Sequence, residues 1–78
     1  MSKHKAEYDA VLRCAEFVRD YAEMHKISVT AACDRIGISR KSVYAWEHDG
    51  TAPGLYSLQA LYRAGADLDY IMTGRRDL

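Results

Sequence analysis

Long apolar runs are missing from this chain of 78 residues. None approaches the roughly 20 residues that a helix needs to cross a bilayer, so we expect no membrane partner. The basic residues among positions 1–5 are followed by Glu7 and Asp9 rather than by an apolar stretch, which differs from the pattern of a signal peptide. We therefore expect the protein to act in the cytoplasm.

Cysteine is scarce and occurs at Cys14 and Cys33. A small secreted scaffold held by disulfides would need more cysteines. Both lie within apolar helical patterns, so we interpret them as small buried hydrophobic residues. Neither has a second cysteine or a histidine at the spacing of zinc ligands, and the histidines at positions 4, 25 and 48 are scattered. We expect no metal ion and no other cofactor.

An excess of charge of one sign is also absent, because eleven basic residues balance eleven acidic ones. This balance argues against a protein that adheres to nucleic acid through broad electrostatic attraction. The charges are unevenly spread, however. Residues 7–23 hold two basic and five acidic residues, a net charge of −3, whereas residues 35–48 hold three basic and one acidic residue, a net charge of +2. A neutral total thus conceals a modestly basic middle.

Proline occurs once, at Pro53, and no alternation of apolar and polar residues predicts a strand. Apolar residues instead recur at spacings of three and four, which predicts an all-α protein. The hydrophobic share of 49% is typical of a folded chain, and this length allows one domain. We divide the chain into a flexible N-terminal arm at 1–5, a helical domain at 6–74 and a C-terminal tail at 75–78.

The first predicted helix covers about 6–25 and has one apolar stripe. The stripe consists of Ala10, Val11, Cys14, Ala15, Val18, Tyr21 and Ala22. A second, short helix begins after Ser28, whose side-chain oxygen can accept from its free amides, and ends at Gly37. Its apolar face consists of Val29, Ala32, Cys33 and Ile36. The third helix begins after Ser39 and runs to about His48.

The third helix ends where Asp49 and Gly50 tolerate left-handed backbone angles. A fourth helix follows Pro53-Gly54 and ends at Gly65, and a short fifth helix is capped by Asp67 and ends at Gly74. The apolar residues of the fourth are Leu55, Leu58, Leu61 and Tyr62, and those of the fifth are Leu68, Ile71 and Met72.

Two short helices joined by Gly37-Ile38-Ser39 are typical of a helix-turn-helix. At 100° per residue, Val43 and Trp46 of the third helix point inward. Its outward stripe consists of Lys41, Tyr44, Ala45 and His48, with Arg40 at the N-terminal edge. Such a face suits the major groove of a duplex, because basic side chains can donate to guanine O6 and N7 and a small residue lets the backbone approach. Tyr44 and His48 can donate to phosphates.

Three parts of the sequence resemble the phage repressor and Cro-like (XRE) family. They are the turn Gly37-Ile38-Ser39, the pair Trp46-Glu47 and the closing residues 68–74, Leu-Asp-Tyr-Ile-Met-Thr-Gly. Residues 28–47 as a whole, followed by Pro53, Leu58 and Leu61, are similar to the family's pattern, and the resemblance covers about 10–76. It implies a compact five-helix, lambda-repressor-like domain with a helix-turn-helix at its second and third helices. It also implies a transcriptional regulator, a repressor, that binds a double-stranded DNA operator.

The resemblance also implies roles for single residues. Ser28 and Val29 match positions that approach phosphates, Val29 through its backbone amide, and Thr51 matches a position that contacts the DNA backbone. Arg40, Lys41 and Ala45 match positions that face the bases. The full set of candidate DNA-binding residues is Ser28, Val29, Ser39, Arg40, Lys41, Ser42, Tyr44, Ala45, His48 and Thr51. Many relatives pair the glutamate at Glu47 with an arginine where this chain has Ala22, so Glu47 needs Arg19 or a backbone amide instead.

The chain shows no Cys-His or Ser-His arrangement and no phosphate-binding glycine loop, so we expect neither an enzyme nor a small-molecule substrate. The competing hypothesis is a protein-interaction module that keeps the helix-turn-helix without binding DNA, which the zero net charge favours. A DNA-binding protein that has one such helix is expected to form a homodimer on a palindromic operator. Two regions offer spare apolar residues for pairing. They are the C-terminal one with Tyr70, Met72 and Leu78, and the first helix with Tyr8, Leu12 and Phe17.

Overall fold

The computed structural model describes residues 5–76, and within them the protein is all-helical, as the sequence predicts. Five helices follow one another: α1 (Lys5–His25), α2 (Val29–Ile36), α3 (Arg40–His48), α4 (Leu55–Arg63) and α5 (Leu68–Thr73). The first begins at Lys5, a residue assigned above to the arm, and the fourth ends two residues before Gly65. Residues 1–4 of the expected arm and residues 77–78 of the tail, with Leu78, lie outside the described residues.

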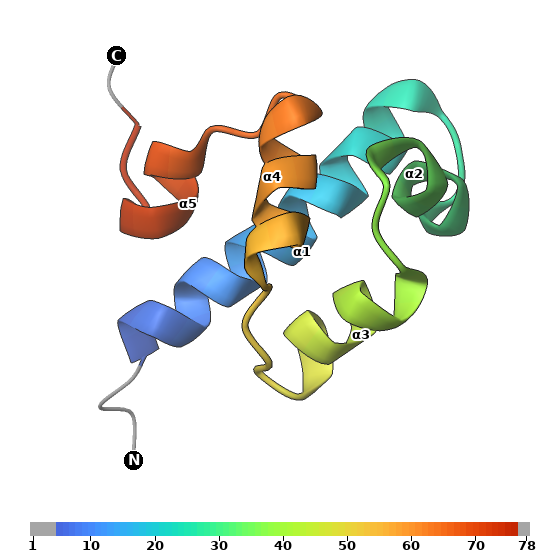
Figure 1. Cartoon of the computed structure of the whole chain (residues 1–78). Coiled ribbons are helices and arrows are strands. Elements are labelled where there is room, and N and C mark those ends of the chain that lie inside the picture. The colour runs from blue at the N-terminus through green and yellow to red at the C-terminus, as the bar shows by residue number, and fades with distance from the viewer. Residues whose placement is uncertain (1–4, 77–78) are drawn as a thin grey trace.

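Helix α1 organises the domain because α2, α3 and α5 all pack against it. Figure 1 shows it running diagonally behind α4, with α2 and α3 on one side and α5 on the other. Five residues of its predicted stripe are buried, namely Val11, Cys14, Ala15, Val18 and Ala22, and the other two, Ala10 and Tyr21, are half-buried. The radius of gyration of 12.0 Å matches the roughly 11.5 Å expected for a compact chain of this length.

Side-chain caps fix where three helices begin. The hydroxyl of Ser28 accepts from the amide of Ala31 at 3.0 Å, and Asp67 accepts from the amide of Tyr70 at 3.1 Å. Ser39 caps α3 in the same way, because its side chain accepts from the amide of Ser42. Each cap satisfies an amide that the first turn of a helix leaves without a partner. The predicted starts of α2, α3 and α5 are therefore confirmed.

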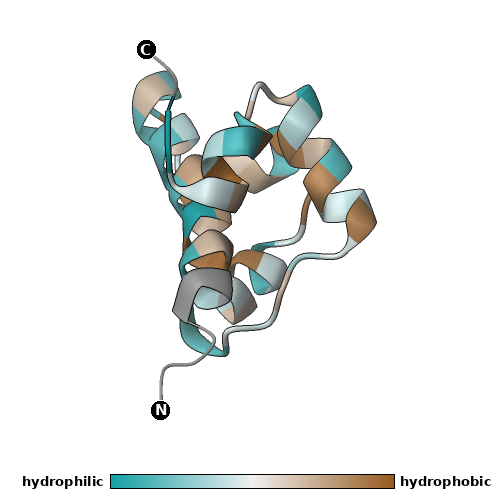
Figure 2. Cartoon of the chain, turned by 90° about the vertical axis from the view of Figure 1, so that its left-hand side faces the viewer, coloured by the Kyte–Doolittle hydropathy of each residue, from teal (hydrophilic) through white to brown (hydrophobic). Residues whose placement is uncertain are grey.

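Three residues that the sequence placed among the apolar residues of α4 and α5 are exposed rather than buried. Leu55 and Tyr62 were assigned to the apolar face of the fourth helix, yet both are largely exposed, and so is Met72 in α5. The buried side of α4 runs through Leu61 and the half-buried Leu58, and α4 packs mainly on α2. A short helix that touches few neighbours buries only part of its apolar surface. Figure 2 shows the hydrophobic segments of α4 reaching the right-hand edge of the molecule.

The two cysteines are buried and unbridged, which confirms their interpretation as small hydrophobic residues. Burial raises the pKa of Cys14 to about 11, despite the nearby guanidinium of Arg13. Burial also raises the pKa of Cys33 above its ordinary value. No helix among residues 5–76 is long and apolar enough to cross a membrane.

Candidate nucleic-acid interface

The turn between α2 and α3 sets the direction in which α3 leaves the core. Gly37 caps α2 with a φ of 94°, a left-handed backbone angle that residues with a Cβ rarely adopt. The amides of Gly37 and Ile38 both donate to the carbonyl oxygen of Cys33, at 2.8 and 3.0 Å. Ile38 packs against the core, so the turn is held from both its backbone and its side chain.

One side of α3 anchors the helix in the core. Val43 is fully buried and Trp46 is 2% exposed, and the helix packs against both α1 and α2. Because Trp46 is among the largest fully buried side chains, it fixes the rotation of α3 about its own axis. The inward positions predicted for these two residues are confirmed.

The opposite side of α3 is open to solvent. Arg40, Lys41, Tyr44 and His48 are exposed, while Ala45 is half-buried at the edge of this side. We call these five residues the outward face of α3. The face carries two permanent positive charges near the helix N-terminus and no acidic side chain, so it can attract an anion.

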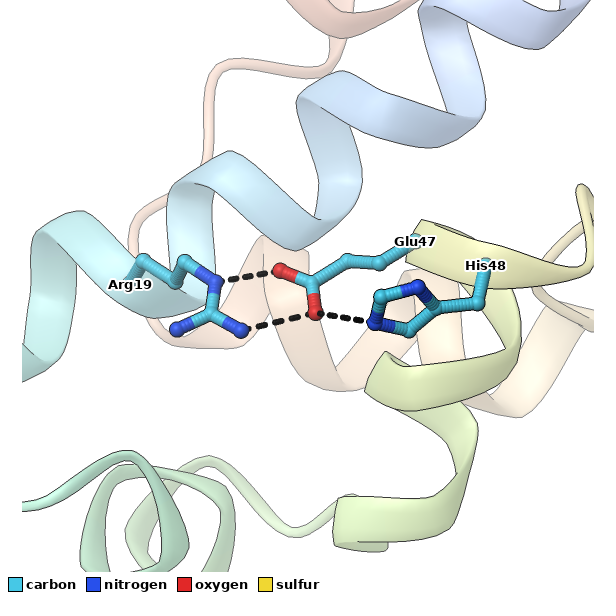
Figure 3. A network of polar contacts seen from close by, with 3 residues as sticks. All are labelled: Arg19, Glu47 and His48. Carbon is cyan, nitrogen blue, oxygen red and sulfur yellow. Dashed lines mark hydrogen bonds and ion pairs between the residues drawn. The ribbon is translucent and has the colours of Figure 1, made fainter.

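An ion pair joins α3 to α1 beside this face. Nη2 of Arg19 donates to Oε1 of Glu47 at 2.7 Å, and Nε of Arg19 donates to Oε2 of the same carboxylate. Figure 3 shows the carboxylate between the guanidinium of Arg19 and the ring of His48, whose Nε2 lies 4.0 Å from Oε1. The sequence left either Arg19 or a backbone amide as the partner of Glu47, and in the structure the partner is Arg19. Paired contacts of this kind constrain the orientation of both side chains.

The pair also balances the negative charge of Glu47, which lies beside the outward face. The hydrogen bonds from Arg19 hold the pKa of Glu47 below its ordinary value, and the same bonds raise the pKa of Arg19. Glu47 therefore stays ionised and paired at neutral pH. Its charge is balanced mainly by Arg19, which lies on α1, and to a smaller extent by Arg40, while Lys41 is not among the groups that shift it.

Two aromatic rings lie side by side on the outward face. The rings of Tyr44 and His48 are one helical turn apart, with centroids 4.3 Å apart and planes inclined by 40°. Both side chains are exposed and carry polar groups that can donate hydrogen bonds. The sequence placed both residues on this face, but their contact was not anticipated, although their spacing of four residues is a signal for it.

Serine hydroxyls surround the start of α3. Oγ of Ser39 accepts from the amide of Ser42 at 3.0 Å, and the two hydroxyls lie 2.9 Å apart. Ser39 is exposed and Ser42 is half-buried. These two residues therefore share the first turn of α3 with Arg40 and Lys41. Their hydroxyls already have partners within the chain, so their first task is to hold that turn.

The remaining candidate DNA-binding residues lie at the start of α2 and in the loop after α3. Ser28 is exposed and caps α2, and Val29 is half-buried against the core, which leaves its backbone as the part suited to an anion. Thr51 is exposed in the loop after α3, and its amide donates to the carbonyl oxygen of Ala45 at 3.3 Å. Gly50 has a φ of 69° in this loop, so it adopts the left-handed backbone angle that the sequence predicts it to tolerate.

Within residues 5–76, no group of three or more His, Cys, Asp or Glu side chains could hold a metal ion. Comparisons with protein families, with curated proteins and with solved structures found no match to the chain. The function is therefore argued from the arrangement of the α2–α3 segment and the chemistry of its exposed side chains.

Proposed function

We propose that α2 and α3 form a helix-turn-helix of the phage repressor and Cro-like kind, and that the protein is a sequence-specific, double-stranded DNA-binding regulator of transcription. One observation carries the proposal: α3 is fixed to the core by Val43 and Trp46, and its outward face presents Arg40 and Lys41 at its N-terminal end. A rigid helix with basic residues at this end is suited to the major groove.

The outward face divides into two chemical roles. Arg40 and Lys41 donate to guanine O6 and N7, and Ala45 is small enough to let the helix approach a thymine methyl. Tyr44 and His48 donate to phosphates at the groove edge, where their contact with each other holds both rings in place. The free backbone amides at the start of α2 attract a further phosphate. This contact needs no polar side chain, so it is compatible with the half-buried Val29.

The protein acts as a homodimer that represses transcription from a palindromic operator in the cytoplasm. A single domain of this size contacts too little DNA for high affinity, whereas two copies related by a two-fold axis read half-sites about one helical turn apart. Because the net charge is zero, binding to DNA must come from a localised face rather than from overall attraction.

Selection of bound sequences from a random duplex pool tests the proposal. We expect enrichment of a two-fold symmetric site and an affinity for it that falls steeply as salt is raised. A pool that shows no enrichment, together with binding that salt leaves unchanged, would assign the segment to a protein-interaction module instead.

A further inference from the structure

The exposed side of α4 is unusually apolar for a surface helix. Leu55 is 70% exposed, Tyr56 is 86% exposed and Tyr62 is 65% exposed. Gln59 and Arg63 complete this side, and we call the five residues the α4 face. Beside it lies a groove of about 440 Å³, which Leu58 and Leu68 line together with four residues of the face.

The area of the α4 face is close to what a stable dimer needs. The two tyrosines alone expose on the order of 300 Å², since a tyrosine buries about 150–250 Å² in full. With Leu55, Gln59 and Arg63 added, the face approaches the roughly 600 Å² per partner at which stable interfaces begin. That is about a tenth of the 5558 Å² that the chain exposes, the share that small partners usually bury.

We propose that the α4 face binds the same face of a second copy, with the two α4 helices antiparallel across a two-fold axis at Gln59. At 100° per residue, Leu55, Gln59 and Tyr62 lie within an arc of about 60°. Gln59 is at the middle of this stripe, so the antiparallel arrangement places it opposite itself and places Leu55 opposite the partner's Tyr62. An isologous interface requires such self-complementarity.

The chemistry of the face matches this arrangement. A glutamine amide both donates and accepts, so two copies of Gln59 can pair on the axis. Tyr56 and Arg63 lie on the same flank of α4 at opposite ends, which brings Arg63 over the ring of the partner's Tyr56 as a cation–π contact. A parallel two-fold arrangement would place Tyr56 and the partner's Arg63 on opposite flanks and at opposite ends, so this contact could not form.

Of the apolar residues that the sequence offered for pairing, Tyr70 and Phe17 are engaged within the chain, whereas Met72 and Tyr8 are less exposed than the apolar residues of the α4 face. Tyr70 lies under the guanidinium of Arg76 at 3.8 Å and donates to Glu16, and Phe17 packs against the core. The ring of Tyr8 lies so near Gly50 that a Cβ there would come within 3.3 Å of it. The α4 face contains none of the candidate DNA-binding residues, so pairing through it leaves the outward face of α3 free. The inference rests on the proposed function, for which it supplies the dimer.

Charges introduced on the axis test the proposal by sedimentation without DNA. Gln59→Lys alone and Gln59→Glu alone place like charges together, and each should raise the dissociation constant of the dimer by about tenfold or more. An equal mixture of the two should restore dimers, because opposite charges then meet. Met24→Lys is the control: Met24 is 77% exposed on α1, so the same added charge should leave the dimer unchanged.

Cysteine crosslinking tests the orientation. Leu55→Cys mixed with Tyr62→Cys should form disulfide-linked dimers, whereas either variant alone should not, and the native cysteines are buried. A wild-type chain that stays monomeric, Gln59 variants that dimerise as well as wild type, or crosslinking of Leu55→Cys with itself would each overturn the arrangement. Dimers that fail to bind any duplex would contradict the proposed function and leave the interface standing. A monomer that binds a single half-site would overturn both the interface and the proposed homodimer, while DNA binding by α3 would stand.

Discussion

At the scale of single residues, the ion pair between Arg19 and Glu47 joins α3 to α1. The sequence left Glu47 with two possible partners, because the residues are 28 positions apart and their meeting depends on how two helices cross. A helical period predicts which face a residue occupies but not which residue of another helix lies opposite. The identity of the partner thus required the structure.

The pair predicts a pH dependence of stability. Because Arg19 lowers the pKa of Glu47 in the folded state, the pair's contribution is fully present above the ordinary value of 4.5 and is lost as the pH falls through the lower, folded value. Thermal unfolding of Glu47→Gln at pH 7 should show a loss of about 1 kcal/mol, which shrinks toward pH 3. Glu23→Gln, an exposed control, should show no such loss, and an equal loss at both pH values would contradict the account.

Trp46 carries the packing of α3. Replacing it with alanine should cost about 3–5 kcal/mol, against a total stability of about 5–15 kcal/mol for a domain of this kind, because the indole is buried and the cavity cannot fully collapse. Circular dichroism should find Trp46→Ala unfolded or nearly so. Tyr44→Ala, an exposed aromatic on the same helix, should melt close to wild type. A cooperative and barely shifted melt of Trp46→Ala would show that the core does not depend on α3.

At the scale of helices, periodicity predicts α3 well and α4 poorly. In α3 the inward residues Val43 and Trp46 meet two other helices, so the apolar stripe is also the buried stripe. In α4 the apolar residues span a wider arc than the neighbours cover, and Leu55 and Tyr62 remain exposed. Caps are predictable because they depend on residues three positions apart, as Ser39 and Ser42 show.

The outward face of α3 makes a prediction about base selectivity. Arg40→Ala or Lys41→Ala should each weaken binding to the selected site by about 1–3 kcal/mol and relax selectivity at one base pair, because each loses a donor to a base edge. Titrations on the selected site and its single-base variants measure both effects. Arg75→Ala removes an equal charge from an exposed residue outside α3 and should change neither. Equal weakening on all sequences would assign Arg40 and Lys41 to phosphates.

Ala45 tests how closely α3 approaches its ligand. Ala45→Glu places a carboxylate at the edge of the outward face without touching Val43 or Trp46, so the fold should survive while binding to the selected duplex is abolished by repulsion from phosphates. Ala45→Ser is the matched control, since it is small and neutral. Wild-type affinity in Ala45→Glu would exclude this face from the interface.

At the scale of the whole molecule, the all-helical fold and nearly every helix boundary follow from the sequence, because local periodicity and caps define them. The α4 face, which we propose to pair two copies, does not follow in the same way. Leu55 and Tyr62 have the pattern of core residues, and only the arrangement of the helices reveals that they face solvent. The uneven charge is visible in the sequence, but the structure adds that Arg19 balances Glu47 beside the outward face.

Methylation interference on a selected duplex tests the central claim, that α3 reads the major groove, most directly. Methyl groups on guanine N7 lie in that groove, where Lys41 and Arg40 are proposed to donate. We predict that they block the wild-type protein in two half-sites about one helical turn apart, and that Lys41→Ala becomes insensitive to one guanine in each half-site. Binding that ignores N7 methylation, or an interference pattern identical for wild type and Lys41→Ala, would contradict the account.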